Sequence, residues 1–215
     1  MATRFQPTLY LDVGVASTTR DGEDTSGDLH LVRSVNGGRD RGVLVAVVDG
    51  LGHGADAAAA ARIAIDTLDR HAGAPIPELI QRCHAALVGS RGVVMSVAHF
   101  DVTRDTITWV GLGNVAGVLV PGDRVGRPPY TTLVTRGGIV GTAMGQLPVV
   151  RPWVIPIQPQ DLLVLATDGL RADFSDDISL QHGPQETAAT LLARHGKGTD
   201  DALVLIARYR GGDRS

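Results

Sequence analysis

Aspartates lie at the ends of apolar segments in an arrangement typical of a metal site. Asp49 closes the segment VAVVDG and Asp168 closes LVLATDG, and each is followed at once by glycine. Asp200 and Asp201 precede the last apolar segment, and Asp28 opens an earlier one. A strand end holds a carboxylate rigidly, and a following glycine lets the backbone turn closely around an ion and offer its carbonyl. Oxygen donors of this kind favour Mg²⁺ or Mn²⁺.

Ordinary turns and zinc are the alternatives to this interpretation of the aspartates. A single Asp-Gly pair more often makes a turn, so the interpretation depends on the whole set. The single cysteine, Cys83, and the absence of an HExxH motif exclude an internal disulfide and argue against zinc. Glu23 and Asp24, close to Asp28, are interpreted as solvated loop residues.

Hydrophobic spacing predicts many short strands and three helices. The alternation over Leu9–Val15 predicts a half-buried strand, whereas the continuous run Gly42–Val48 predicts a strand covered on both faces. Further strands are predicted at Leu29–Val35, Val93–Phe100, Thr106–Val110, Val115–Val120, Thr131–Thr135, Trp153–Ile157, Leu162–Ala166 and Ala202–Tyr209. Helices are predicted over Ala55–Leu68, from Pro75 to Leu87 with Cys83 in the core, and over Pro184–Arg194. The short connections favour antiparallel pairing and an α+β domain.

Composition and charge restrict the classes of partner. The 20 Lys and Arg residues are balanced by 23 Asp and Glu, so the chain lacks the basic excess of nucleic-acid-binding proteins. No stretch approaches the roughly 20 apolar residues of a membrane helix, and Asp12 within the first apolar segment argues against a signal peptide. We therefore expect a cytoplasmic protein with neither nucleic acid nor a membrane as partner.

Five motifs in combination resemble a known family. They are SGD (26–28), DGLGHG (49–54), GLGN (111–114), ATDGL (166–170) and TDDALVLIAR (199–208). Their order and spacing resemble the SpoIIE-like bacterial branch of the metal-dependent type 2C (PPM) Ser/Thr protein phosphatases. The resemblance covers nearly the whole chain, so we expect one such phosphatase domain over residues 1–215. Because no sensor module precedes that domain, the stand-alone, RsbX-like members are the most similar.

The resemblance implies a four-layer α/β/β/α sandwich, in which helices flank two antiparallel β-sheets, with two Mn²⁺ or Mg²⁺ ions at one end. Carried over by position, Asp49 bridges both ions and the Gly50 carbonyl binds one of them. Asp168 and Asp200 hold the other ion, and Asp28 supports the second metal. Asp49 and Asp168 are therefore the expected catalytic residues. A water activated between two such ions attacks the phosphoryl group in line, without a covalent phosphoenzyme.

Three other positions differ from the family pattern or support it. Asp201 stands where type 2C enzymes often have asparagine and is expected to support the ligands. Asn114 is expected either to support the site or to form a turn. The broad pattern has a histidine directly after Asp-Gly as a candidate general acid, whereas this chain has Leu51 there and His53 two residues later. His53 is interpreted mainly as a structural residue at the start of a helix.

No arginine matches the phosphate-binding arginine of eukaryotic relatives. Arg20 and Arg33 are loose candidates for that role. The Gly-rich segment 136–147 lacks the Lys-Ser/Thr of a P-loop and is interpreted as a mobile loop near the site.

The expected function is hydrolysis of phosphoserine or phosphothreonine on STAS-domain regulators of a stressosome or partner-switching pathway. An NAD(P)-binding oxidoreductase is an alternative, because residues 50–55 match the fingerprint GxGxxA, although the acidic residue expected about 20 positions later falls at Asp69, within a predicted helix. A non-catalytic phosphoprotein-binding module is the third hypothesis. Four converging carboxylates repel one another without metal, which argues for catalysis over binding alone.

Overall fold

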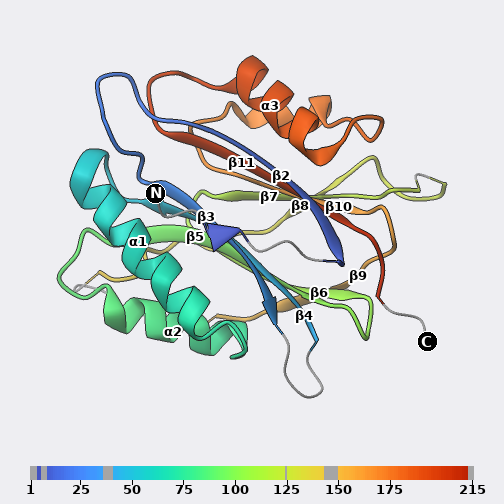
Figure 1. Cartoon of the computed structure of the whole chain (residues 1–215), viewed down its shortest axis with the longest axis horizontal. Helices are drawn as coiled ribbons and strands as arrows, with labels where there is room; N and C mark the ends of the chain where they lie inside the picture. The colour runs from blue at the N-terminus through green and yellow to red at the C-terminus, as the bar shows by residue number, and fades with distance from the viewer. Residues whose placement is uncertain (1–3, 6–8, 36–40, 124, 143–149, 213–215) are drawn as a thin grey trace.

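Two β-sheets pack face to face, and helices cover both outer faces (Figure 1). The computed structural model describes residues 4–5, 9–35, 41–123, 125–142 and 150–212. Helices α1 (Gly54–Arg70) and α2 (Ile76–Ala86) lie on one sheet, and α3 (Pro184–His195) lies on the other (Figure 1). A short 3-10 helix, η1 (Ala172–Asp177), precedes α3. The predicted four-layer α/β/β/α sandwich is confirmed.

The strands pair antiparallel with one exception. The first sheet has the order β1 (Arg4–Phe5), β3 (Asp28–Val35), β4 (Gly42–Gly50), β5 (Val93–Asp101), β6 (Thr106–Leu112) and β9 (Trp153–Pro156). The second has the order β2 (Leu11–Thr18), β11 (Ala202–Tyr209), β10 (Leu162–Ala166), β7 (Ala116–Val120) and β8 (Thr131–Leu133). The two-residue β1, which the sequence did not predict, runs parallel to β3.

Strand β4 is buried along both faces, as its continuous apolar run predicts. Val43, Val45 and Val47 belong to the core between the sheets, together with Leu163 and Leu205 of the second sheet. The alternate residues Leu44, Ala46 and Val48 belong to the core beneath α1 and α2. The period of two in a strand therefore divides one apolar run between two cores.

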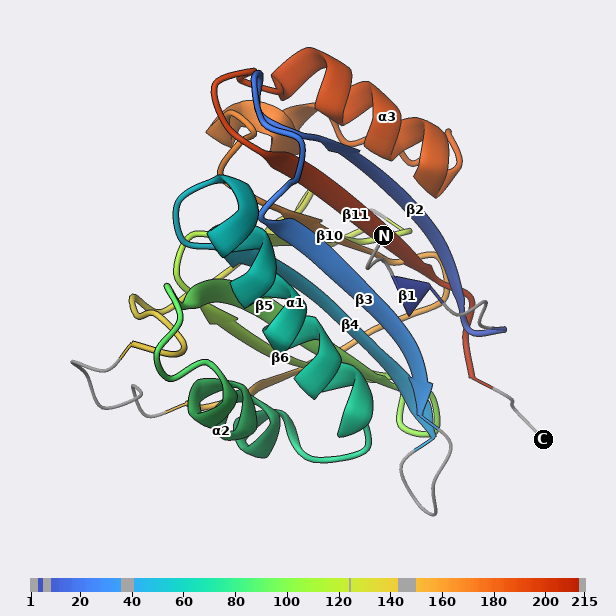
Figure 2. The same cartoon turned by 60° about the vertical axis from the view of Figure 1, so that its left-hand side comes forward.

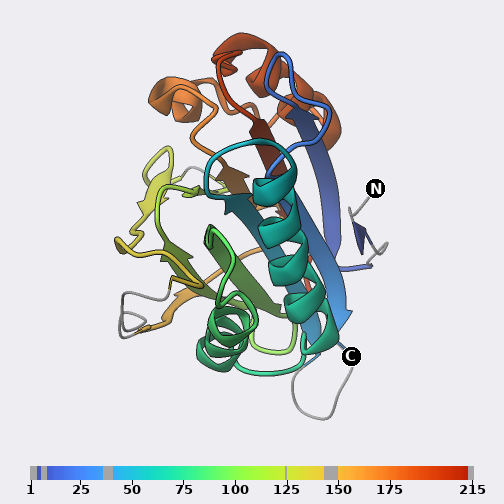
Figure 3. The same cartoon turned by 90° about the vertical axis from the view of Figure 1, so that its left-hand side faces the viewer.

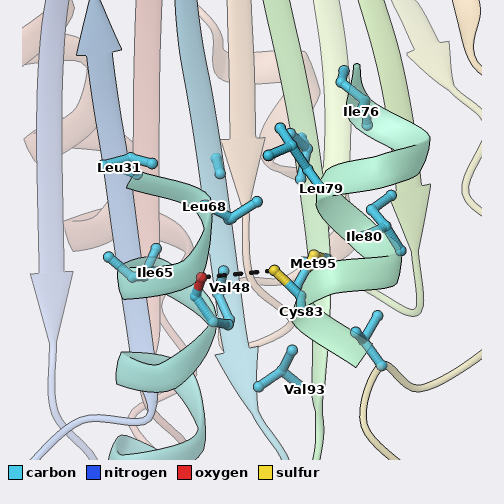
Figure 4. Packing of buried hydrophobic residues seen from close by; sticks show 14 of the residues in the cluster. Leu31, Val48, Ile65, Leu68, Ile76, Leu79, Ile80, Cys83, Val93 and Met95 are labelled. Carbon is cyan, nitrogen blue, oxygen red and sulfur yellow. Dashed lines mark hydrogen bonds between the residues drawn. The ribbon is translucent and has the colours of Figure 1, made fainter. Parts of the chain in front are cut away.

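Helix α1 lies across the first sheet (Figure 2), and its small side chains allow a close approach. Ala57, Ala60, Ala61 and Ala64 are fully buried on this helix. Cys83 of α2 lies in the same core, with its thiol 3.7 Å from the Ala64 carbonyl oxygen (Figure 4). Burial raises the pKa of this thiol to about 12, so Cys83 is an inert core residue, as predicted.

Local differences from the sequence predictions occur at element ends. Strand β2 begins at Leu11, and Leu9 is 84% exposed. Of the Gly-rich segment 136–147, Arg136 and Val140 form isolated bridges to β6 and β5. Residues 143–147 of the same segment lie outside the described residues. Within the described ranges, no helix is long and apolar enough to cross a membrane.

Substitution of Gly50 tests how tightly the end of β4 packs on α1. A Cβ atom at position 50 would stand 2.2 Å from the Ala57 carbonyl oxygen, so the helix must shift to admit it. We expect G50A to lower the free energy of unfolding in metal-free buffer by about 1–3 kcal/mol. In the control G137A, the added methyl meets nothing within 4 Å. Equal stability of the two variants by urea unfolding would contradict this packing.

Candidate functional site

Antiparallel pairing gathers the predicted aspartates at one end of the sandwich, the end that faces the viewer in Figure 3. Asp28 begins β3 and is the register partner of Asp49 on β4. Asp168 follows the end of β10, and Asp200 precedes the start of β11, its antiparallel neighbour. In each pair of antiparallel strands, the end of one strand lies beside the start of the next. Four segments that are distant in the sequence therefore lie at the same end of the sandwich.

Thr167 links the two sheets at this end. Its hydroxyl donates a 2.6 Å hydrogen bond to Oδ2 of Asp28 and accepts one of 2.9 Å from the Leu203 amide. Asp28 lies in the first sheet, whereas Thr167 and Leu203 lie at the ends of strands of the second. Thr167 was not predicted as a site residue, although its place inside the ATDGL motif is a usable signal.

The carboxylate of Asp201 holds the loop that leads into β3. It accepts hydrogen bonds from the backbone amides of Gly27 (2.7 Å) and Arg20 (2.8 Å). Asp200 in turn accepts a 2.9 Å hydrogen bond from the Asp201 amide. These bonds fix the position from which Asp28 enters the site, because Gly27 precedes it in the chain.

Burial and mutual repulsion raise the pKa values of two of the aspartates. The pKa of Asp28 rises to about 7, mainly through burial and also through the charges of Asp201, Asp168 and Asp200, against the lowering effect of the Thr167 hydrogen bond. The pKa of Asp49 rises to about 8 through burial and the charges of the same group, including Asp28. The site therefore concentrates negative charge that a cation would stabilise.

A pocket of about 200 Å³ opens beside this cluster. Its walls are Arg20, Asp49, Leu51, Gly52, His53, Val94, Asn114, Asp168 and Asp200. Asn114 donates a 2.6 Å hydrogen bond to Oδ2 of Asp168, and the Lys197 ammonium donates to the carbonyl of Asp168. Three predicted ligands and the predicted supporting residue Asn114 thus share one cavity.

His53 lies in the wall of this pocket rather than serving only the helix. It is the N-cap residue of α1, but its side chain makes no capping hydrogen bond. Its Nδ1 instead lies 2.6 Å from Oε1 of Glu23. Glu23 is therefore not the solvated loop residue that the sequence suggested, because its carboxylate orients the imidazole.

The two arginine candidates differ in position. Arg20 lines the pocket, and its guanidinium has no hydrogen bond or ion pair within the described chain. Arg33 is paired with Asp69 of α1, with Nε and Oδ1 3.4 Å apart. Of these two arginines, Arg20 is therefore the one placed to contact a ligand in this pocket.

The donor chemistry of the site fits a hard divalent cation. Its ligand candidates are carboxylate oxygens and backbone carbonyls, and the charge excess on Asp28 and Asp49 has no cationic side chain bonded to it in the described residues. Among those residues, no three His, Cys, Asp or Glu side chains are already gathered as a metal site. Mutual repulsion keeps unpaired carboxylates apart, and a cation would draw them together.

The fold does not support the dinucleotide-binding interpretation of residues 50–55. That fingerprint requires a parallel βαβ unit. Strand β4 pairs antiparallel with both neighbours, β3 and β5. Asp69, the residue nearest the expected ribose-binding position, lies in α1 and pairs with Arg33. The oxidoreductase hypothesis is wrong for this topology.

Comparisons with known proteins agree with this fold. The family model described as stage II sporulation protein E (SpoIIE) matches residues 39–210. Phosphoserine phosphatase RsbX of Bacillus subtilis (strain 168) is 26% identical over 110 residues, 51% of this chain and 53% of the relative, so the chain spans about half the length of this curated relative.

Solved structures share the architecture over most of the chain. A structure described under the bacterial stressosome, a modular system adapted to control secondary messenger signalling, has a TM-score of 0.81 at 26% identity and covers 92% of this chain and 99% of its own. The structure of RsbX in complex with magnesium has a TM-score of 0.80 at 18% identity, and the match covers 95% of this chain and 98% of the RsbX chain. The second likeness, at that identity, concerns the fold alone.

The raised pKa values predict how stability depends on pH without metal. The folded protein keeps Asp28 and Asp49 protonated up to about pH 7 and 8, whereas the unfolded chain ionises them near 3.8. Because the folded state then binds more protons, the free energy of unfolding should fall as pH rises from about 4 to 8. D49N should make this fall shallower in urea titrations with EDTA, and an equally steep fall would contradict the charge cluster.

Proposed function

The chain belongs to the SpoIIE family, and on that premise we propose that it is a metal-dependent protein serine/threonine phosphatase. The observation that carries the proposal is that Asp49, Asp168 and Asp200 line one polar pocket, with Asp28 next to Asp49 on the adjacent strand. Burial and the charges of neighbouring aspartates raise the pKa values of Asp28 and Asp49, an arrangement that costs stability unless a cation is bound. The proposed domain covers residues 1–215.

Two Mn²⁺ or Mg²⁺ ions are the proposed cofactors. Asp49 would contact both, the Gly50 carbonyl would bind one, and Asp168 and Asp200 would hold the other, with Asp28 supporting the second. Divalent ions in such a centre activate a water and neutralise charge on the phosphoryl oxygens. Asp201 and Asn114 hold the ligand-bearing segments, since they bond the loop before β3 and Asp168 respectively.

Arg20 is the proposed contact for the substrate phosphate. Arg20 lines the pocket, its guanidinium has no partner in the described chain, and a guanidinium binds phosphate oxygens in a bidentate manner. Its backbone amide is bonded to Asp201, so the residue itself is anchored at the site.

His53 is the proposed proton donor to the leaving group, with Glu23 as its positioning residue. A serine alkoxide is a strong base and leaves readily only when protonated. As water attacks phosphorus, it loses one proton to solvent, and the electron pair of the breaking P–O bond goes to the serine oxygen, which takes the Nε2 proton of His53. The products are the serine hydroxyl and hydrogen phosphate, and solvent reprotonates His53. Nδ1 contacts Glu23, and Nε2 is the ring nitrogen without a hydrogen bond to the part of the chain that the structure describes.

Phosphorylated STAS-domain proteins of a stressosome or partner-switching pathway are the proposed substrates, in a cytoplasmic setting. The similarity to phosphoserine phosphatase RsbX and to a structure of the bacterial stressosome supports this substrate class. The pocket also suits a protein substrate, because it is open, polar and too small to enclose more than the phosphorylated side chain.

Removal of a ligand charge tests the proposed function. We expect D49N and D168N each to abolish Mn²⁺-dependent phosphate release from a phosphorylated STAS protein, while the melting temperature in EDTA stays equal or rises because repulsion is relieved. The control D24N neutralises an exposed aspartate of the loop before β3 and should keep full activity. A nonspecific phosphopeptide assayed in parallel measures substrate preference. Full activity of D49N or D168N removes that residue from the mechanism, and an inactive wild type favours a binding module.

The leaving group tests the role of His53. Because p-nitrophenolate leaves without protonation, H53N should lower kcat for a phosphoserine peptide by about 100-fold or more and barely change hydrolysis of p-nitrophenyl phosphate. Asparagine is a good N-cap residue, so α1 should keep its stability. E23A should show the same selective loss, and E23Q should recover part of it, because its amide oxygen still accepts from Nδ1. The control H71N makes the same change at the C-cap of α1. Equal losses on both substrates would mean that His53 only maintains the site.

A further inference from the structure

An aromatic and basic surface lies at the edge of both sheets, outside the catalytic pocket. It consists of Val134, Arg136, Arg151 and Trp153, which we call the edge patch. These residues line a separate hollow of about 180 Å³ with the buried Trp109 among its walls. Trp153 begins β9, the edge strand of the first sheet, and Val134 follows β8, the edge strand of the second (Figure 1).

The side chains of the edge patch are unusually available for contact. Trp153 is 43% exposed and Val134 is 72% exposed, whereas the register partner of Trp153, Trp109, is buried. Arg136 and Arg151 are both exposed and have no hydrogen bond or ion pair from their guanidinium groups in the described chain. Tryptophan and arginine are the residue types that most often dominate binding energy at interfaces.

Within the described residues, no carboxylate compensates the charge of the edge patch. Apart from its two arginines, the hollow is lined by Val, Gly, Leu and Trp residues, with no carboxylate among them. Several other exposed arginines are paired, for example Arg82 with Glu78 and Arg91 with Asp56. A partner that supplies carboxylates beside an apolar group would therefore complement this surface.

The backbone connects the edge patch to the catalytic pocket. The Arg136 amide donates to the Gly111 carbonyl (3.0 Å), and the Gly113 amide donates to the Arg136 carbonyl (2.8 Å). The next residue, Asn114, lines the catalytic pocket and bonds Asp168. A chain segment bound at the edge patch therefore lies close to the phosphorylated residue seated in the pocket.

We propose that the edge patch docks an acidic segment of the phosphoprotein substrate, with an apolar side chain against Trp153 and carboxylates against Arg136 and Arg151. This inference rests on the proposed phosphatase function and assigns it a specificity surface. The contact lowers KM for substrates whose phosphorylated residue is flanked by acidic sequence. It leaves the chemical step unchanged, because none of the four residues lines the catalytic pocket.

Two phosphoserine peptides of equal length test the docking surface, one with acidic and apolar flanking residues and one with neutral polar ones. Wild type should bind and hydrolyse the acidic peptide with a KM about 10-fold lower, as expected for a contact of interface hot-spot strength. R136E, R151E and W153A should each remove this preference, with kcat and the hydrolysis of p-nitrophenyl phosphate unchanged. Added salt should weaken the preference of wild type more than that of R151E.

A matched control separates docking from net charge. Arg62 is exposed on α1, and its guanidinium also has no partner in the described chain, so R62E makes the same charge change away from the edge patch. Binding of labelled peptides to metal-free wild type, measured by fluorescence anisotropy, gives a readout that needs no turnover. If the protein prefers the acidic peptide in binding but hydrolyses neither peptide, the result would contradict the proposed phosphatase function and still support the docking surface.

Three results would overturn the docking surface. The first is a peptide preference that R136E and R151E change no more than R62E does. The second is a parallel loss of p-nitrophenyl phosphate hydrolysis, which would mean that the substitutions disturb the catalytic pocket. The third is a dimer in sedimentation experiments that W153A converts to a monomer, because a second copy of the chain would then occupy the edge patch.

Discussion

The burial of Asp28 and the partial burial of Asp49 beside other carboxylates form the constraint on which the catalytic end of this protein depends. Asp28 and Asp49 face each other across β3 and β4, and their pKa values of about 7 and 8 reflect burial together with the charges of Asp168, Asp200 and Asp201. A protein interior tolerates such a cluster only if protons or cations neutralise it. The same feature that destabilises the metal-free fold therefore creates affinity for divalent ions.

The sandwich supplies the rigidity that this cluster requires. Asp28 and Asp49 are register partners on adjacent strands of one sheet, and the Thr167 hydroxyl ties Asp28 to the second sheet. Gly50 and Gly169 allow close approach, since a Cβ atom would stand 2.2 Å from the Ala57 carbonyl oxygen and 2.0 Å from that of Asp201. The glycines that allow close packing therefore directly follow the aspartates that carry the charge of the site.

Local signals in the sequence predicted the parts of the structure that short-range physics determines. The period of two in β4, the alanines of α1 and the Asp-Gly strand ends are such signals, and the core position of Cys83 follows from helical spacing. The bond from Thr167 to Asp28 and the contact between Glu23 and His53 join residues far apart in the chain, so no local pattern predicts them. Strand β1 and helix η1 are too short for periodicity to reveal.

Anomalous diffraction from crystals grown with Mn²⁺ tests the central claim most directly, because it locates the ions without relying on activity. The account predicts two adjacent Mn²⁺ peaks, with oxygen ligands from Asp49 on both ions and from Asp168 and Asp200 on one of them. Asp49 and Asp168 without manganese between them, or manganese bound only elsewhere on the molecule, would contradict it.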